Sequence, residues 1–141
     1  MKSVENNPQH SSSIRAYFEE QSALVRAGGY WNCLTAARKL SALLLAEGHS
    51  PWIARLRKTE LVGGQVFHAP LIPRLQGVAA AWTTHYICCC DEIAYDPVAG
   101  EAIRLEVYSS QVFGMEISLE VFVTSTELPA YLANLGFHER P

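Results

Sequence analysis

Two stretches with helical periodicity, separated by a pair of glycines, occupy the first third of this sequence and limit what it can fold into. The first stretch starts at Ser12 or Ser13, and its apolar residues follow one helical stripe up to the glycines at 28 and 29. The second stretch covers residues 31–47, and Cys33 lies on its apolar stripe. Amphipathic helices must each bury one face, so the sequence predicts that both pack against another layer of structure.

The hydrophobic pattern changes to the period of strands after residue 51. Strands are predicted at residues 52–57, after a turn at residues 62–67, and at residues 81–90, 93–95 and 116–124. Short helices are predicted at residues 105–114 and 125–136, and a surface connection at the proline-containing residues 68–77. Because helices come first and strands later, we expect an α+β fold with N-terminal helices packed on an antiparallel sheet.

Composition and charge narrow the classes of function. The 141 residues suit one domain, expected at residues 12–141 after a flexible polar tail at residues 1–11. The net charge of −3 and the lack of a basic stripe argue against nucleic acid as a partner. No apolar stretch reaches the roughly 20 residues that cross a bilayer, and the polar start lacks the apolar segment of a signal peptide. The expected location is therefore the cytoplasm, without membrane contact.

The four cysteines are Cys33 and the consecutive Cys88, Cys89 and Cys90. This spacing makes a poor disulfide framework. Neighbouring residues of a strand point to opposite faces, so three consecutive thiols cannot converge on one metal ion. The sequence therefore predicts reduced thiols and no metal site.

Cys33 is predicted at the start of the second helix, directly after two glycines, two aromatic residues and Asn32. Unpaired backbone N–H groups and the helix dipole at such a position favour the thiolate, the nucleophilic form of cysteine. The same N–H groups can bind the oxyanion that forms when a thiolate attacks a carbonyl. A packing role stays open as the alternative, because cysteine is among the most buried residue types.

A cysteine nucleophile needs a base, and His85 is the best candidate. It lies inside a predicted strand of apolar and small residues, where a histidine gains nothing from burial unless its ring nitrogens find partners. In the predicted hairpin, the return strand brings Asp96 back beside His85, where its carboxylate can accept the imidazole N–H. Asp91, at the turn, is the alternative third member.

Three segments in this order resemble the papain-like and transglutaminase-like cysteine superfamily, in particular small bacterial papain-fold domains of the toxin or deamidase type. They are "GGYWNCLTAARKLSALLLAEGHSP", "THYICCCDEIAYDP" and "LEVYSSQVFG", which together span residues 28–114. The resemblance implies a papain-like fold with a cysteine on the first core helix, a histidine on a strand and an acidic or amide residue on the next strand. By position, these residues are Cys33, His85 and Asp96.

One feature of the family pattern is missing from this sequence. Papain-type enzymes carry a glutamine several residues before the nucleophile, which completes the oxyanion hole, whereas residues 24–32 contain none and Gln21 lies farther away. Asn32 is therefore the candidate oxyanion or substrate contact, and Trp31 is the candidate wall of the substrate cleft.

The resemblance implies a cysteine-dependent hydrolase or acyltransferase that attacks a peptide or glutamine carboxamide and forms an acyl-enzyme. The expected partner is a peptide or protein glutamine, and the mechanism needs no cofactor. Two alternatives remain at this stage: a non-catalytic binding module with the same fold, and an unrelated α+β domain whose cysteines are all structural.

Overall fold

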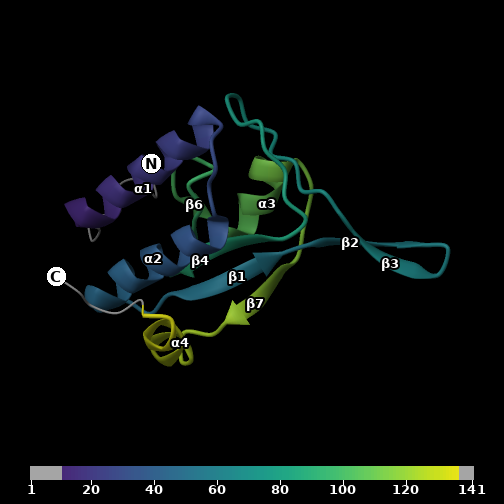
Figure 1. The fold of residues 1–141 in the computed structure, drawn as a ribbon. Helices are drawn as coiled ribbons and strands as arrows, with labels where there is room; N and C mark the ends of the chain where they lie inside the picture. Colours follow the sequence, from purple (N-terminus) through teal and green to yellow (C-terminus); the bar gives the residue numbers. More distant parts are fainter. Residues whose placement is uncertain (1–10, 137–141) are drawn as a thin grey trace.

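The computed structural model describes residues 11–136 and shows an α+β arrangement of helices and antiparallel strands (Figure 1). The predicted tail at residues 1–11 lies outside the described residues except for Ser11, and so do the last five residues of the predicted domain. The helices of the described part are α1 (Ser12–Ala27), α2 (Cys33–Ala46), α3 (Leu105–Phe113) and α4 (Leu128–Asn134). The α+β class predicted from the order of helical and strand patterns is confirmed. None of these helices combines the length and the hydrophobicity needed to cross a membrane.

The main sheet of the described residues has five strands in the order β6-β5-β4-β1-β7, and all neighbouring strands are antiparallel. Its strands are β1 (Trp52–Leu56), β4 (His85–Cys90), β5 (Ile93–Tyr95), β6 (Ile103–Arg104) and β7 (Leu119–Val123). The buried strand β1 lies between β4 and β7, with Ile53 opposite Cys88 and Ala54 opposite Ile87. The centre of the sheet is therefore built by strands that are far apart in the sequence.

The two faces of the sheet are covered by different elements. On one face, α1, α2 and α4 bury an apolar cluster that includes Leu40, Ile53, Cys88 and Cys90. On the other face, α3 buries a second cluster that includes Ile87 and Cys89. The predicted alternation of the consecutive cysteines is confirmed, because the thiols of β4 divide between the two faces.

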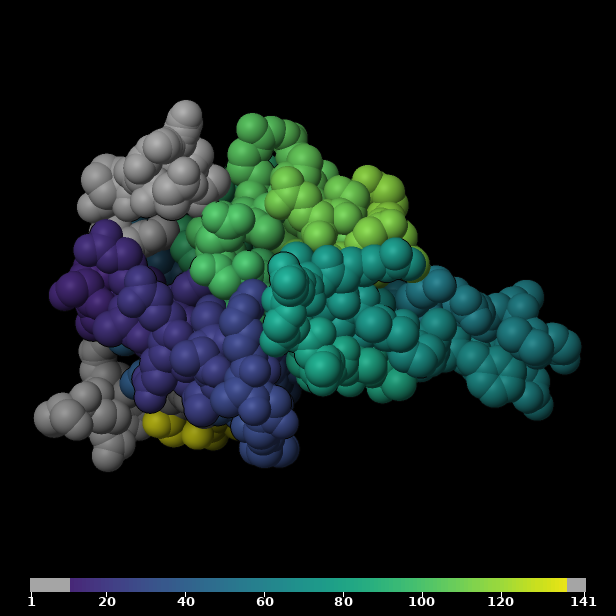
Figure 2. Space-filling view, turned by 90° about the horizontal axis from the view of Figure 1, so that it is seen from above, coloured from purple at the N-terminus to yellow at the C-terminus, as the bar shows by residue number. Residues whose placement is uncertain are grey.

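A separate hairpin of β2 (Lys58–Val62) and β3 (Gln65–Ala69) leaves the body of the molecule. Figure 2 shows it projecting to the right, away from the helices and the main sheet. Its two strands pair only with each other among the described residues, and several of its apolar side chains are exposed, with Leu61 at 73 %.

Residues 70–84 return from this hairpin to the main sheet and differ from the prediction. The strand expected at 81–90 begins only at His85, because the backbone of Trp82 bonds to Leu71 in both directions, at 2.6 and 3.1 Å. The predicted surface connection at residues 68–77 also contains the last two residues of β3 and the buried Leu71, which packs into the cluster beneath α3. In Figure 2 this segment lies between the start of α2 and α3.

Candidate active site

Cys33 is the first residue of α2, and the cap before it fixes where the helix begins. The side-chain oxygen of Asn32 accepts a hydrogen bond from the Thr35 amide at 2.9 Å, and its backbone oxygen accepts from Ala36. Helix geometry leaves the amides of Cys33 and Leu34 without an intrahelical acceptor. The thiol therefore lies at the positive end of the helix dipole, and Cys33 is 8 % exposed.

His85 is the first residue of β4, and its imidazole is fully buried. Its Nε2 atom lies 2.8 Å from Oδ2 of Asp96, a distance at which the ring donates to the carboxylate. The other ring nitrogen, Nδ1, has no partner with hydrogen-bond geometry among the described residues. The Cys33 thiol is nevertheless close enough to affect the ring through its charge and its hydrogen-bonding capacity. The thiol and the imidazole are thus neighbours without a well-formed hydrogen bond, and Nδ1 is the ring atom left for proton exchange.

The end of the sheet explains how these two side chains meet. By the alternation of β4, His85 points to the same face as Ile87 and Cys89, which α3 covers, whereas the body of α2 packs on the opposite face. Because His85 stands at the very start of β4, its ring lies where the sheet ends. Helix α2 begins close to this end of the sheet (Figure 1), so its first residue interacts with His85.

Asp96 follows β5 directly and is fully buried. Its Oδ2 accepts from His85 and from the hydroxyl of Tyr108 on α3, and its Oδ1 accepts from the Val98 amide at 3.0 Å. Three donors therefore satisfy this carboxylate without water, as a buried charged group requires. The Asp96 carboxylate therefore fixes the orientation of the His85 ring, beside which the sequence placed it.

Helix α1 holds the loop that carries Asp96. The Ser22 hydroxyl donates to the backbone oxygen of Pro97 at 2.8 Å, and the Arg26 guanidinium donates to the backbone oxygen of Val98 at 3.2 Å. Both acceptors lie within two residues of Asp96. Helix α1 therefore holds the backbone that follows Asp96, whereas Tyr108 of α3 contacts the Asp96 side chain.

The electrostatics of the site favour a protonated imidazole. Burial by itself lowers the pKa of His85, but the charge and hydrogen bond of Asp96, together with the Cys33 thiol, outweigh it and raise the pKa to about 10. Burial also raises the pKa of Tyr108 well above its usual value, and the Asp96 charge adds to this effect. Tyr108 therefore keeps its proton and serves as a hydrogen-bond donor.

Aromatic side chains surround the imidazole of His85. The Trp82 ring lies against it at a tilt of 32°, with the centroids 4.6 Å apart, and the Trp31 and Phe113 rings lie at 6.3 and 6.0 Å. The Trp31 indole also donates to Oε1 of Gln21 at 2.7 Å. The site is thus covered by tryptophans from two segments, one before α2 and one in the 70–84 loop.

The structure brings four of the five predicted site residues into contact with one another or with a shared partner: Cys33, His85, Asp96 and Trp31. The fifth, Asn32, lies beside them in sequence, but its side chain caps α2 and donates to the Tyr30 hydroxyl at 3.1 Å. Asp91, the alternative to Asp96, lies past the other end of β4, and the His85 ring bonds to Asp96.

Three further residues around the site were not selected from the sequence. Tyr108 lies on the apolar face of a predicted helix, where a buried hydroxyl needs a partner, and this was a usable signal. Trp82 was predicted within a strand, and only the Leu71 pairing moves it over His85. Gln21 is 12 positions before Cys33, and α1 and α2 must pack together before its amide meets Trp31.

No protein-family model, no curated protein and no solved structure matches this chain. The resemblance to papain-like proteins therefore stays a prediction, and the function is proposed below from the geometry of the site.

Proposed function

We propose that this chain is a cysteine-dependent hydrolase or acyltransferase that acts on a carboxamide, in a glutamine side chain or a peptide bond. One observation carries the proposal: the His85 ring donates from Nε2 to buried Asp96, while the Cys33 thiol at the start of α2 interacts with the same ring. Nucleophile, base and orienting carboxylate in mutual reach are the elements of a thiol acyl-transfer site.

In the proposed reaction, Cys33 has already given its proton to Nδ1 of His85 when the substrate binds, because the raised pKa of His85 keeps the ring protonated. The thiolate attacks the carbonyl carbon, a C–S bond forms, and the carbonyl oxygen becomes an oxyanion. When the oxyanion collapses, the C–N bond breaks and the imidazolium gives its proton to the departing ammonia or amine. Water or an acceptor amine then attacks the thioester while His85 takes its proton, and the sulfur leaves as thiolate.

The backbone around Cys33 supplies candidate oxyanion donors. The amides of Cys33 and Leu34 are unpaired within the helix and point out of its N-terminus. The Gln21 carboxamide is a further candidate, because its oxygen is engaged by Trp31 and its NH₂ group can donate toward the site. Asn32 contributes through the helix cap that holds these groups in place.

The order of elements is consistent with a papain-like or transglutaminase-like fold. A helix begins with the cysteine, a later strand begins with the histidine, and the aspartate follows the next strand. The proposed mechanism uses side chains and backbone groups alone and requires no cofactor. The proposed substrate is a peptide or protein glutamine. The four free thiols suit a reducing compartment, so we propose that the reaction takes place in the cytoplasm.

The test is covalent labelling by an electrophilic diazoketone analogue of glutamine, followed by intact mass and peptide mapping. We expect one adduct, on Cys33, and release of ammonia from glutamine peptides by the unlabelled protein. Cys33→Ala should abolish both signals and keep the melting temperature. The matched control Cys90→Ser, which removes a thiol at the other end of β4, should retain both. A folded wild-type chain whose four thiols label at equal rates would overturn the proposal.

One observation favours a second candidate, a non-catalytic binding module. Cys33 is nearly buried, and the Trp82 ring covers His85 at 4.6 Å. Trp82→Ala separates the two functions. If Cys33 is labelled only in this variant, the catalytic residues are reactive and the Trp82 ring blocks access to them. If Cys33 is labelled in neither protein, the result favours the non-catalytic binding module.

A further inference from the structure

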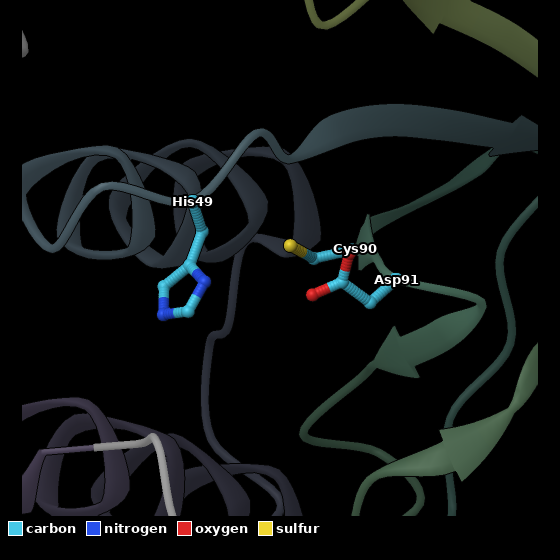
Figure 3. A group of neighbouring side chains, drawn as sticks. All are labelled: His49, Cys90 and Asp91. Atoms are coloured by element: carbon cyan, nitrogen blue, oxygen red, sulfur yellow. The ribbon is translucent and has the colours of Figure 1, made fainter.

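A second cluster of chemically active side chains lies at the opposite end of β4 from His85. It consists of His49 in the connection from α2 to β1, Cys90 at the end of β4, and Asp91 in the following turn. One ligand atom from each residue lies within 4.8 Å of the other two. Figure 3 shows that the Cys90 sulfur and the Asp91 carboxylate both point toward the side where the His49 imidazole lies.

The turn after β4 explains how two consecutive residues can face the same point. In a regular strand, the side chains of Cys90 and Asp91 would point to opposite faces of the sheet. Here the backbone enters the left-handed region directly after the strand, with φ of 52° at Asp91 and 67° at Glu92. This conformation is unusual for residues other than glycine, and it ends the alternation at the point where Asp91 joins Cys90.

The neighbouring backbone supports the sulfur of Cys90. Burial and the neighbouring Asp91 raise the pKa of the Cys90 thiol to about 11, and a backbone hydrogen bond from Ser50, the residue after His49, acts in the opposite direction. An N–H group directed at a thiolate stabilises the charged form that metal ions require, and such supporting contacts orient metal ligands. The connection from α2 to β1 therefore provides both an imidazole and a hydrogen bond to the thiol.

We propose that His49, Cys90 and Asp91 bind one Zn²⁺ ion. A thiolate, an imidazole and a carboxylate are the ligand set that zinc prefers, and the two negative charges balance those of the ion. Cys90 is buried, His49 is half-buried and Asp91 is exposed, so the ligands approach from the protein side. The fourth position faces solvent and takes water.

The ion would join two segments that are about 40 residues apart in the sequence, the connection from α2 to β1 and the turn from β4 to β5. This role is independent of the chemistry at Cys33. The proposed site uses only one of the three consecutive cysteines, so the alternation of their side chains along β4 does not exclude it. His49 and Asp91 become its partners through the pairing of β1 with β4.

The test is titration of the chelator-stripped full chain with Co²⁺ and then Zn²⁺ in a phosphine reductant. We expect one Co²⁺ per chain, visible bands of tetrahedral intensity, a thiolate-to-cobalt charge-transfer band, and displacement by Zn²⁺. His49→Gln, Cys90→Ser and Asp91→Asn should each weaken binding at least about tenfold. The matched controls His68→Gln and Glu92→Gln, which remove an exposed histidine and the adjacent carboxylate, should leave the affinity unchanged.

Cys33 and His85 are also metal-binding types, so the titration is repeated in Cys33→Ala. Retention of the charge-transfer band in this variant, and its loss in Cys90→Ser, assigns the ion to the proposed cluster. Asp91→Asn is exposed and keeps the test valid if a buried substitution disturbs the fold. Absence of one-to-one binding, or a band that disappears in Cys33→Ala and persists in Cys90→Ser, overturns the proposal.

Discussion

The imidazole of His85 is fully buried, yet it binds its proton more tightly than an exposed histidine does. The reason is the carboxylate of Asp96 at 2.8 Å, whose attraction for the charged ring exceeds the cost of burial. A buried imidazole held in one orientation by a carboxylate is positioned to exchange a proton with Cys33. The His85–Asp96 pair therefore affects both the stability of the folded chain and the reactivity of the Cys33 thiol.

The first prediction concerns stability against pH. The unfolded histidine titrates near 6.5, while the folded pKa of His85 is raised to about 10. The stabilisation is complete below pH 6.5 and falls as pH rises toward the folded pKa, because the unfolded chain releases its proton first. We expect the unfolding free energy to fall by roughly 1 kcal/mol per pH unit between about 6.5 and 7.5, below the pKa near 8.5 of free thiols.

Denaturant unfolding at several pH values measures this slope in the wild type and in His85→Gln. The variant has no imidazole at this position, so its unfolding free energy should change much less across the same range. Equal slopes for the two proteins would mean that the folded chain does not hold the His85 proton.

At this scale, sequence reasoning identified the residues that stand out from their surroundings. Cys33 marks a helix start, and His85 is the polar residue in an apolar strand, so both were recognisable without a structure. The sequence indicates that the Tyr108 hydroxyl needs a partner, but it does not identify Asp96 as that partner, because the two meet only after α3 has packed on the sheet.

Helix α2 is the element on which the proposed nucleophile depends. Its N-terminus is defined by Asn32, which caps the Thr35 amide and so leaves the Cys33 thiol at the positive end of the dipole. Helix α1 has an equivalent cap at Ser11, whose hydroxyl accepts from Ile14. The two caps are chemically alike, but only one lies beside the site.

The second prediction compares these caps. Asn32→Ala and Ser11→Ala should each lower the unfolding free energy by about 1 kcal/mol, because each leaves a first-turn amide unpaired. Only Asn32→Ala should also slow the alkylation of Cys33, since it disturbs the helix end that favours the thiolate. Thermal unfolding measures the stability, and peptide mass analysis measures the alkylation rate of Cys33. Equal alkylation rates in both variants would show that the Asn32 cap does not affect the reactivity of the thiol.

Element boundaries were less predictable than the elements themselves. The apolar pattern of residues 81–90 suits a strand throughout, but the first four residues instead belong to the loop that pairs with Leu71. The short strand β6 has two residues and therefore no periodicity to detect. Such boundaries depend on which partner each backbone segment finds.

Across the whole molecule, stability comes from the two apolar layers that cover the sheet. Leu40 on α2 is fully buried in one layer, whereas Leu61 on the β2–β3 hairpin is 73 % exposed. The hairpin projects from the body, so its apolar side chains add little to the core (Figure 2).

The third prediction compares the same leucine-to-alanine substitution at a buried position, Leu40, and at an exposed position, Leu61. Leu40→Ala should lower the unfolding free energy by roughly 2–5 kcal/mol, because it leaves a cavity in the core. Leu61→Ala should change it by less than about 0.5 kcal/mol. Denaturant unfolding checks both values, and a large loss at Leu61 would show that the hairpin contributes to the folded core.

The class of the fold could be predicted because helical and strand patterns occupy separate parts of the sequence. The order of strands could not, because β1 lies between β4 and β7, and such long-range pairings leave no local signal. The same pairings bring Cys33 to His85, which explains why the candidate triad could be listed by residue but not placed.

The proposed function requires cooperation between the Cys33 thiol and the His85 imidazole, and the most direct test is the rate at which iodoacetamide alkylates Cys33 at pH 7. Peptide mass analysis follows each thiol separately in the wild type and in His85→Gln. We predict that Cys33 reacts at least about tenfold faster in the wild type, and faster there than Cys88, Cys89 or Cys90. Equal rates for Cys33 in two folded proteins would contradict the account.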